Sequence, residues 1–91
     1  MADQNPANTF ARYGLAMELV KTGDLAAAAN EFAEVRKIDP AYAAAYFHGG
    51  QTLEKLDRLD EAREVYRAGI AHTRDPHARG ELQAALDILG E

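Results

Sequence analysis

The sequence contains no cysteine, and only three prolines occur in its 91 residues. The absence of cysteine excludes disulfide bonds, thiol nucleophiles and cysteine-ligated zinc, and it fits a reducing compartment. The first six residues contain neither a basic start nor an apolar run, so we expect no signal peptide, no membrane span and a cytoplasmic protein. The apolar fraction of 47%, in which alanine is the commonest residue, favours closely packed helices.

Basic side chains are in the minority, with 10 Lys and Arg against 15 Asp and Glu and a net charge of −5. No strongly basic segment is available to neutralise phosphates, so we expect no nucleic-acid binding. We find no Ser-His-Asp set, glycine-rich phosphate loop or matched carboxylate pair, and we therefore expect no enzymatic activity. The three histidines, His48, His72 and His77, lack the spacing of a metal site, so we expect neither a metal nor another cofactor.

A period of 34 residues runs through the chain. The segment 23–28 has its counterpart in 57–62. Further matches at the same offset are Ala11 with Ala45, Tyr13 with Phe47, Ala16 with Gly50, Leu19 with Leu53, Lys21 with Lys55 and Phe32 with Tyr66. A fixed period of this length is typical of helical repeats, in which each unit buries its apolar face against its neighbour.

Apolar residues at helical spacing predict five helices, at about 7–22, 25–38, 41–56, 59–72 and 76–90. An Asx-Pro pair occurs three times, as Asn5-Pro6, Asp39-Pro40 and Asp75-Pro76. We interpret each pair as the end of one element and the start of a helix. Asp or Asn can accept hydrogen bonds from the first turn, and proline lacks a donor there.

The turns inside the two repeats have their own signals. Gly23 is expected to take the left-handed conformation after the first helix, and Asp24 to cap the second. Asp57 stands in the place of Gly23 one period later, and Asp visits the left-handed region more readily than most residues.

The repeat resembles the tetratricopeptide repeat. The residues that carry the resemblance are Leu15, Ala16, Leu19, Gly23, Asp24, Ala28, Phe32, Asp39 and Pro40 in the first copy, and Tyr46, Gly50, Leu53, Ala62, Tyr66 and Gly69 in the second. The resemblance implies an all-α fold, a right-handed α-α superhelix of five antiparallel helices in one domain. Its parts would be a first repeat at about 7–40, a second at about 41–74 and a capping helix at about 76–90.

The pattern also predicts how the helices pack. The small residues Ala16 and Gly50 would face Ala28 and Ala62, so that each helix pair can close. Phe32, Tyr46 and Tyr66 are expected in the core.

The chain departs from the family pattern at four places. Arg12 replaces a bulky aromatic residue, which fits a first helix that forms an open edge. Gly49 replaces a leucine, so the Gly49-Gly50 pair is expected to weaken the third helix by up to ~1 kcal/mol per glycine. Arg74 replaces a proline, and Pro76 comes two residues late, so we expect a remodelled last turn.

In this family, one face of the first helix of each repeat lines a concave groove that holds a peptide or a partner's helix. By position, the resemblance places seven residues there: Tyr13, Met17 and Lys21 from the first repeat, and Phe47, His48, Gln51 and Lys55 from the second. Phe10 and Glu54 would lie near the rim, and Glu81 and Ala85 would close the far side. The alternative for Tyr13 and Phe47 is that they pack in the core.

The resemblance therefore implies a non-enzymatic module that binds a peptide or helix of a partner protein of unknown identity. The alternative is a structural role, as a weak homo-oligomer or as part of a larger scaffold. Some members of the family bind the C-terminal carboxylates of heat-shock chaperones through Lys and Asn side chains. Tyr13, Met17 and His48 occupy those places here, so we expect no such binding.

Overall fold

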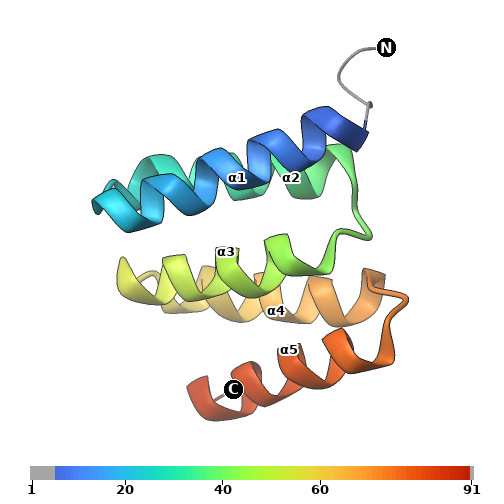
Figure 1. Ribbon diagram of the computed structural model, residues 1–91. Coiled ribbons are helices and arrows are strands. Elements are labelled where there is room, and N and C mark those ends of the chain that lie inside the picture. Colours follow the sequence, from blue (N-terminus) through green and yellow to red (C-terminus); the bar gives the residue numbers. More distant parts are fainter. Residues whose placement is uncertain (1–5, 91) are drawn as a thin grey trace.

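Within residues 6–90, which the computed structural model describes, five helices form two layers (Figure 1). Their bounds are α1 Pro6–Thr22, α2 Leu25–Ile38, α3 Ala43–Lys55, α4 Leu59–His72 and α5 Pro76–Leu89. Helices α1, α3 and α5 form one layer, α2 and α4 form the other, and consecutive helices run antiparallel (Figure 1). The all-α fold is confirmed. None of these helices combines the length and apolar character that crossing a membrane requires.

The predicted bounds are confirmed except at the start of α3. This helix begins at Ala43, about two residues later than expected. Asp39 and Pro40 form a turn instead, in which the N–H of Tyr42 donates to the Asp39 carbonyl at 3.0 Å. The N–H of Ala41 donates to the Asp39 carboxylate at 3.2 Å. The prediction that this pair starts a helix is wrong, because the carbonyl and the carboxylate of Asp39 both accept hydrogen bonds within the turn.

The third Asx-Pro pair does start a helix. Pro76 is the first residue of α5, and the Asp75 carboxylate accepts a hydrogen bond from the N–H of His77 at 3.0 Å. The connection 73–75 is one residue shorter than the connection 39–42, which confirms the remodelled turn. In the first pair, Asn5 lies outside the described residues, and α1 begins at Pro6.

The turns inside the repeats match each other. Gly23 has φ 87° and Asp57 has φ 61°, so both occupy the left-handed region, as predicted. The N–H of the residue after each turn donates to a carbonyl five positions earlier, from Asp24 to Leu19 and from Arg58 to Leu53, both at 2.9 Å.

Asp24 precedes α2, but its side chain makes no capping hydrogen bond, so that part of the prediction is wrong. Its backbone, at φ −86° and ψ 71°, lies outside the extended conformation that directs an N-cap side chain toward the first turn. Only the Asp24 carbonyl contributes, by accepting from the N–H of Ala28 at 3.0 Å.

The core is built on three aromatic side chains. Phe32 and Tyr66 are fully buried and Tyr46 is 4% exposed, which confirms their assignment. Phe32 belongs to a cluster between α1, α2 and α3, together with Ala16, Ala28, Val35 and Ala45. Tyr46 and Tyr66 belong to a second cluster between α3, α4 and α5, together with Ala29, Leu53, Ala62, Leu82 and Leu86.

The glycine pair in α3 is a site of close packing within an unbroken helix. A Cβ at Gly50 would collide with the ring of Tyr66, and one at Gly49 would lie 2.6 Å from Nη1 of Arg36. The nearest obstacle at position 50 is thus Tyr66, where Ala62 was expected. The Tyr66 ring therefore excludes a side chain at position 50, whereas at position 49 the nearest atom belongs to the flexible end of Arg36 and Cβ of Phe32 lies at 3.2 Å.

We expect Gly50→Ala to lower the free energy of unfolding by roughly 1–3 kcal/mol or more, because the buried Tyr66 ring must move. Gly80 in α5 is the matched control, since a Cβ there would meet nothing within 4 Å. Gly80→Ala should raise the free energy of unfolding by about 0.4–1 kcal/mol. Urea unfolding followed by circular dichroism measures both changes. The close-packing explanation is wrong if the two variants change stability in the same direction.

Candidate functional site

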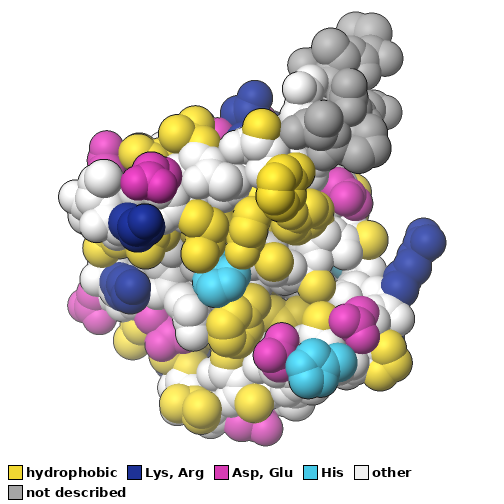
Figure 2. All heavy atoms as spheres, viewed as in Figure 1, with side chains coloured by type: hydrophobic (Ala, Val, Ile, Leu, Met, Phe, Trp, Pro, Cys, Tyr) yellow, Lys and Arg dark blue, Asp and Glu magenta, His cyan; other side chains and the backbone are white. Residues whose placement is uncertain are grey.

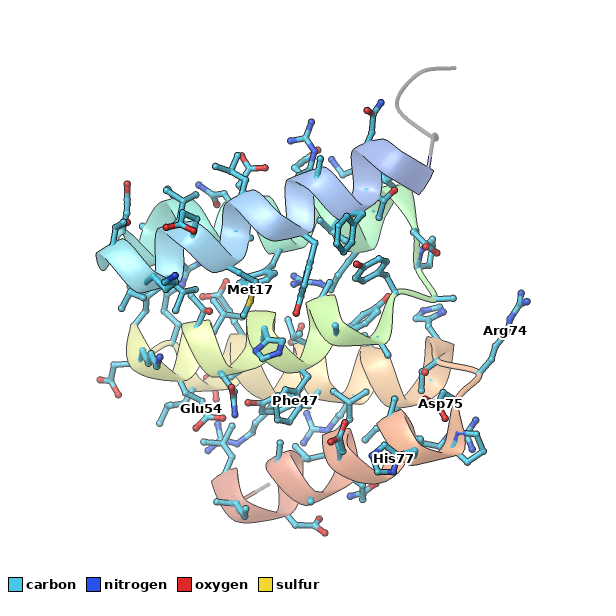
Figure 3. All side chains as sticks on the ribbon, viewed as in Figure 1. Met17, Phe47, Glu54, Arg74, Asp75 and His77 are labelled. Atoms are coloured by element: carbon cyan, nitrogen blue, oxygen red, sulfur yellow. The ribbon has the colours of Figure 1, made fainter. Side chains whose placement is uncertain are left out.

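The predicted site residues lie on the helices of one layer, and we call this surface the α1–α3–α5 face. Figure 2 views this face and shows apolar side chains gathered over the three helices, with a histidine among them. In Figure 3, Met17 extends from α1 toward α3, and Phe47 extends from α3 toward α5. Four of the predicted residues are half-buried, namely Tyr13, Met17, Phe47 and His48, and three are exposed, namely Lys21, Gln51 and Lys55.

Tyr13 packs at the border of the core, and its predicted role in the groove stays a prediction. Its ring centroid lies 5.9 Å from that of the buried Phe32 and 5.3 Å from that of Tyr42. It also lies 6.1 Å from the imidazole of His48, which connects α1 to α3. Burial raises the pKa of Tyr13, with a smaller contribution from Tyr42. Tyr13 is thus anchored in the core on one side and exposed at the surface on the other.

The clearest concavity on this face lies between α3 and α5. A hollow of about 330 Å³ is lined by Phe47, Gln51, Glu54, Tyr66, Glu81, Ala84, Ala85 and Ile88. A second hollow of about 260 Å³ is lined by Ala43, Ala44, Phe47, His48, Asp75, Ala78, Glu81 and Leu82. The two share Phe47 and Glu81, and we call them together the α3–α5 groove.

A buried hydroxyl fixes one carboxylate in this groove. The Tyr66 hydroxyl donates a hydrogen bond to Oε2 of Glu54 at 2.5 Å. Burial, and then the hydrogen bond to Glu54, raise the pKa of Tyr66 well above its ordinary value. Tyr66 therefore remains a neutral donor, and Glu54 is held against the wall of the groove.

His48 lies between Tyr13 of α1 and the smaller hollow of the α3–α5 groove. Its ring packs edge-on against Phe47, with centroids 5.3 Å apart. Burial lowers the pKa of His48 below its ordinary value of 6.5, while Glu81 raises it and Lys55 lowers it by smaller amounts. The imidazole is therefore uncharged at neutral pH, so His48 offers a ring and one N–H donor there.

The structure brings together some of the predicted residues and adds others. Phe47, Gln51, Glu54, Glu81 and Ala85 line one hollow, whereas Tyr13 and Met17 pack against the core of the first repeat. Phe10, predicted at the rim, is 69% exposed.

Ala84 and Ile88 were missed as lining residues. Ile88 is 87% exposed, and it follows Glu81 and Ala85 at helical spacing. That spacing could have placed it on the same face of α5.

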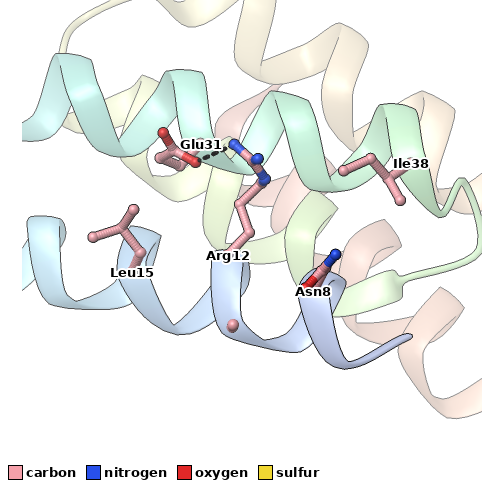
Figure 4. Close-up of a pocket in the computed structure, with 6 residues that line it drawn as sticks. Asn8, Arg12, Leu15, Glu31 and Ile38 are labelled. Atoms are coloured by element: carbon pink, nitrogen blue, oxygen red, sulfur yellow. Dashed lines mark hydrogen bonds and ion pairs between the residues drawn. The ribbon is translucent and has the colours of Figure 1, made fainter. Parts of the chain in front are cut away.

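The α1–α2 edge, at the start of the array, carries an ion pair beside apolar side chains. Nη1 of Arg12 lies 3.0 Å from Oε1 of Glu31, and this ion pair links the two helices across a shallow hollow that Leu15 and Ile38 also line (Figure 4). Leu15 is 50% exposed there. Within residues 6–90, no three His, Asp or Glu side chains converge in a way that could hold a metal ion.

Comparison with known proteins identifies the same repeat. The profile of the tetratricopeptide repeat family matches residues 19–86. A solution NMR structure of a tetratricopeptide repeat domain protein from Salinibacter ruber is similar, with a TM-score of 0.86, 35% identity, and coverage of 93% of this chain and 89% of that one. A crystal structure of a tetratricopeptide repeat domain protein from the same organism gives a TM-score of 0.81, 36% identity, and coverage of 89% and 93%. No curated protein sequence matches the chain significantly.

The half-buried imidazole predicts a pH dependence of stability. Because the pKa of His48 is lower in the folded than in the unfolded chain, protons bind the unfolded chain more readily. The contribution of His48 to the free energy of unfolding is therefore fully present above the unfolded pKa of about 6.5, and it is lost as the pH falls through the folded pKa. We expect the free energy of unfolding of the wild type to decrease between about pH 7 and pH 5, and the decrease to be smaller in His48→Gln.

Urea unfolding at several pH values measures this difference, and an NMR titration of the His48 ring should give a midpoint below 6.5. His77→Gln is the matched control, because the His77 side chain is 83% exposed. A midpoint at or above the ordinary value would contradict the burial of His48.

Proposed function

The chain belongs to the tetratricopeptide repeat family, and we propose that it binds a short segment of a partner protein, a peptide or a helix, on its α1–α3–α5 face. Members of this family generally serve as protein–protein interaction modules. The observation that supports the proposal best is the α3–α5 groove, in which Phe47 contributes to both hollows. The proposed role is non-catalytic and needs no cofactor.

The groove suits a side chain of a partner. A hollow of about 330 Å³ lies at the lower end of the size of ligand pockets, so it admits one or two side chains. The Phe47 ring is held by the core beneath it and has few rotamers, so it adds contact area at little entropic cost. Because helices form the walls, the ordering cost falls mainly on the ligand. With a site of this size we expect affinities in the micromolar range, near −8 kcal/mol.

Helical grooves bind segments in two ways, and both are open to this face. An amphipathic helix can lay its apolar side chains into a groove, and an extended segment can place alternate side chains in pockets. The exposed amide of Gln51 lines the groove and can hydrogen-bond the backbone of an extended segment.

We expect a library of random displayed peptides to yield binders of the wild-type chain that bind Phe47→Ala at least tenfold more weakly, since a central aromatic residue contributes most of the energy of such contacts. Phe47 also packs against the core, so a second variant separates binding from folding. Ile88→Ser changes an 87% exposed residue of the groove and should weaken the same peptides. Leu15→Ser, at the opposite edge, should leave them unaffected. Peptides indifferent to Phe47 and Ile88 would contradict the proposal.

The alternative function is self-association through the α1–α2 edge, where Leu15 is half exposed. The ion pair between Arg12 and Glu31 crosses this edge, with 42% and 25% of the side chains exposed. A partner that covered the edge would remove both charges from water, and this desolvation disfavours a tight dimer. The ion pair therefore disfavours assembly through this edge.

We accordingly expect the purified chain to sediment as a monomer over a broad range of concentrations. Sedimentation velocity of the wild type and of Leu15→Ser measures this directly. A wild-type dimer that Leu15→Ser dissociates would establish the alternative in place of a monomeric binding module.

A further inference from the structure

We propose that the α3–α5 groove recognises a segment in which an apolar side chain is flanked by two cationic ones, Lys or Arg. This inference rests on the proposed function and names the chemistry of the partner. It starts from the floor of the groove, which is apolar, and from its walls, which carry negative charge.

The apolar floor is continuous between the two helices. Phe47 lies on the α3 side, and Ala84, Ala85 and Ile88 lie on the α5 side. Alanine side chains are short, so the hollow is deepest over Ala84 and Ala85 and is bordered by Phe47 and Ile88. An aliphatic or aromatic side chain placed there would remove exposed apolar surface from water on both molecules, at roughly 25 cal/mol per Å².

The charged residues that line the groove are all acidic. Glu54 and Glu81 line the larger hollow, and Asp75 and Glu81 line the smaller one. No lysine or arginine is among the described lining residues of either hollow. His48 is uncharged at neutral pH because burial lowers its pKa. The groove therefore attracts cations and repels carboxylates.

Two of these carboxylates have no strong cationic partner within the described chain. Glu54 accepts its hydrogen bond from the Tyr66 hydroxyl, which is neutral and leaves the charge of Glu54 uncompensated. Oε2 of Glu81 lies 3.7 Å from Nε2 of His77, a pair that carries opposite charges only when that histidine is protonated. Two cationic side chains of a partner would neutralise both carboxylates.

The two carboxylates of the larger hollow lie on opposite walls. Helices α3 and α5 run in the same direction (Figure 1), and the hollow has Glu54 on its α3 wall and Glu81 on its α5 wall. In an extended polyproline-II segment three residues complete a turn, so the side chains on either side of an apolar residue point in different directions. Such a segment can place its apolar side chain on the floor of the groove and direct a cationic side chain toward each wall.

The lysines of the face lie outside the groove. Lys21 and Lys55 are exposed and line neither hollow. A cationic segment that crossed from α5 to α1 would approach them and be repelled. The charge distribution therefore favours a segment that runs along the α3–α5 groove.

The test uses the displayed peptides that bind the wild type and lose binding with Phe47→Ala. We expect these peptides to be enriched in Lys or Arg on both sides of an apolar residue. Synthetic copies are then titrated against the wild type, Glu54→Gln, Glu81→Gln and the double variant by fluorescence anisotropy. Each single substitution should raise Kd about threefold and the pair about tenfold, as expected for exposed ion pairs. Added salt should weaken wild-type binding more than double-variant binding.

Two controls keep the test specific. Glu54→Gln retains an oxygen that can accept the Tyr66 hydrogen bond, so the wall of the groove is preserved. Glu64→Gln makes the same change of charge on an exposed residue of α4, in the other layer, and should leave Kd unchanged. Copies of the peptides with Glu in place of Lys or Arg should bind at least tenfold more weakly.

The outcomes separate the two proposals. Peptides that depend on Phe47 but lack cationic residues, or that bind the double variant as tightly as the wild type, overturn this inference and leave the proposed function standing. If no selected peptide depends on Phe47, both the proposed function and this inference are wrong.

Discussion

The rest of the structure depends on two aromatic rings that pack directly onto glycines. The Tyr66 ring of α4 lies against Gly50 of α3, and Tyr46 of α3 lies against Gly69 of α4. The exchange is reciprocal, so each helix supplies one ring and one glycine and the two backbones approach closely. Leu82 of α5 also reaches Gly69, at 2.8 Å from the position of its missing Cβ. The same contacts thus close the second repeat and seat the last helix, whose position relative to α3 defines the groove.

The architecture could be predicted because the 34-residue period repeats the features that shape helices and turns. Gly23 and Asp57 occupy equivalent positions and share the left-handed conformation, although their side chains differ. The wrong predictions concern side chains with more than one local hydrogen-bonding option. Asp39 closes a turn and Asp75 caps a helix, although both precede a proline. The pattern Asx-Pro does not distinguish these outcomes, because both satisfy the same carboxylate.

For the candidate site, the sequence predicts which residues share a face but not how they are arranged. The family resemblance puts Phe47, Gln51 and Glu81 on one face, and in the structure they line one hollow; that a partner binds there stays a prediction. Tyr66 was correctly assigned to the core, but burial does not reveal where a hydroxyl points. Its hydrogen bond to Glu54 depends on the angle between α3 and α4, which no local pattern encodes. A residue of the core thus helps to arrange the charge of the groove.

The hollow opens between α3 and α5 because short side chains face it from α5, where Ala84 and Ala85 line it. Tyr13 and Phe47 are equivalent in the two repeats but have different surroundings. Tyr13 packs against the rings of Phe32 and Tyr42 and fills its own space, whereas Phe47 borders the hollow. Positions that keep their character in each repeat, such as those of Phe32 and Tyr66, build the scaffold. Positions that change from repeat to repeat create the concavity and its charge, and any preference for a partner must come from these variable positions.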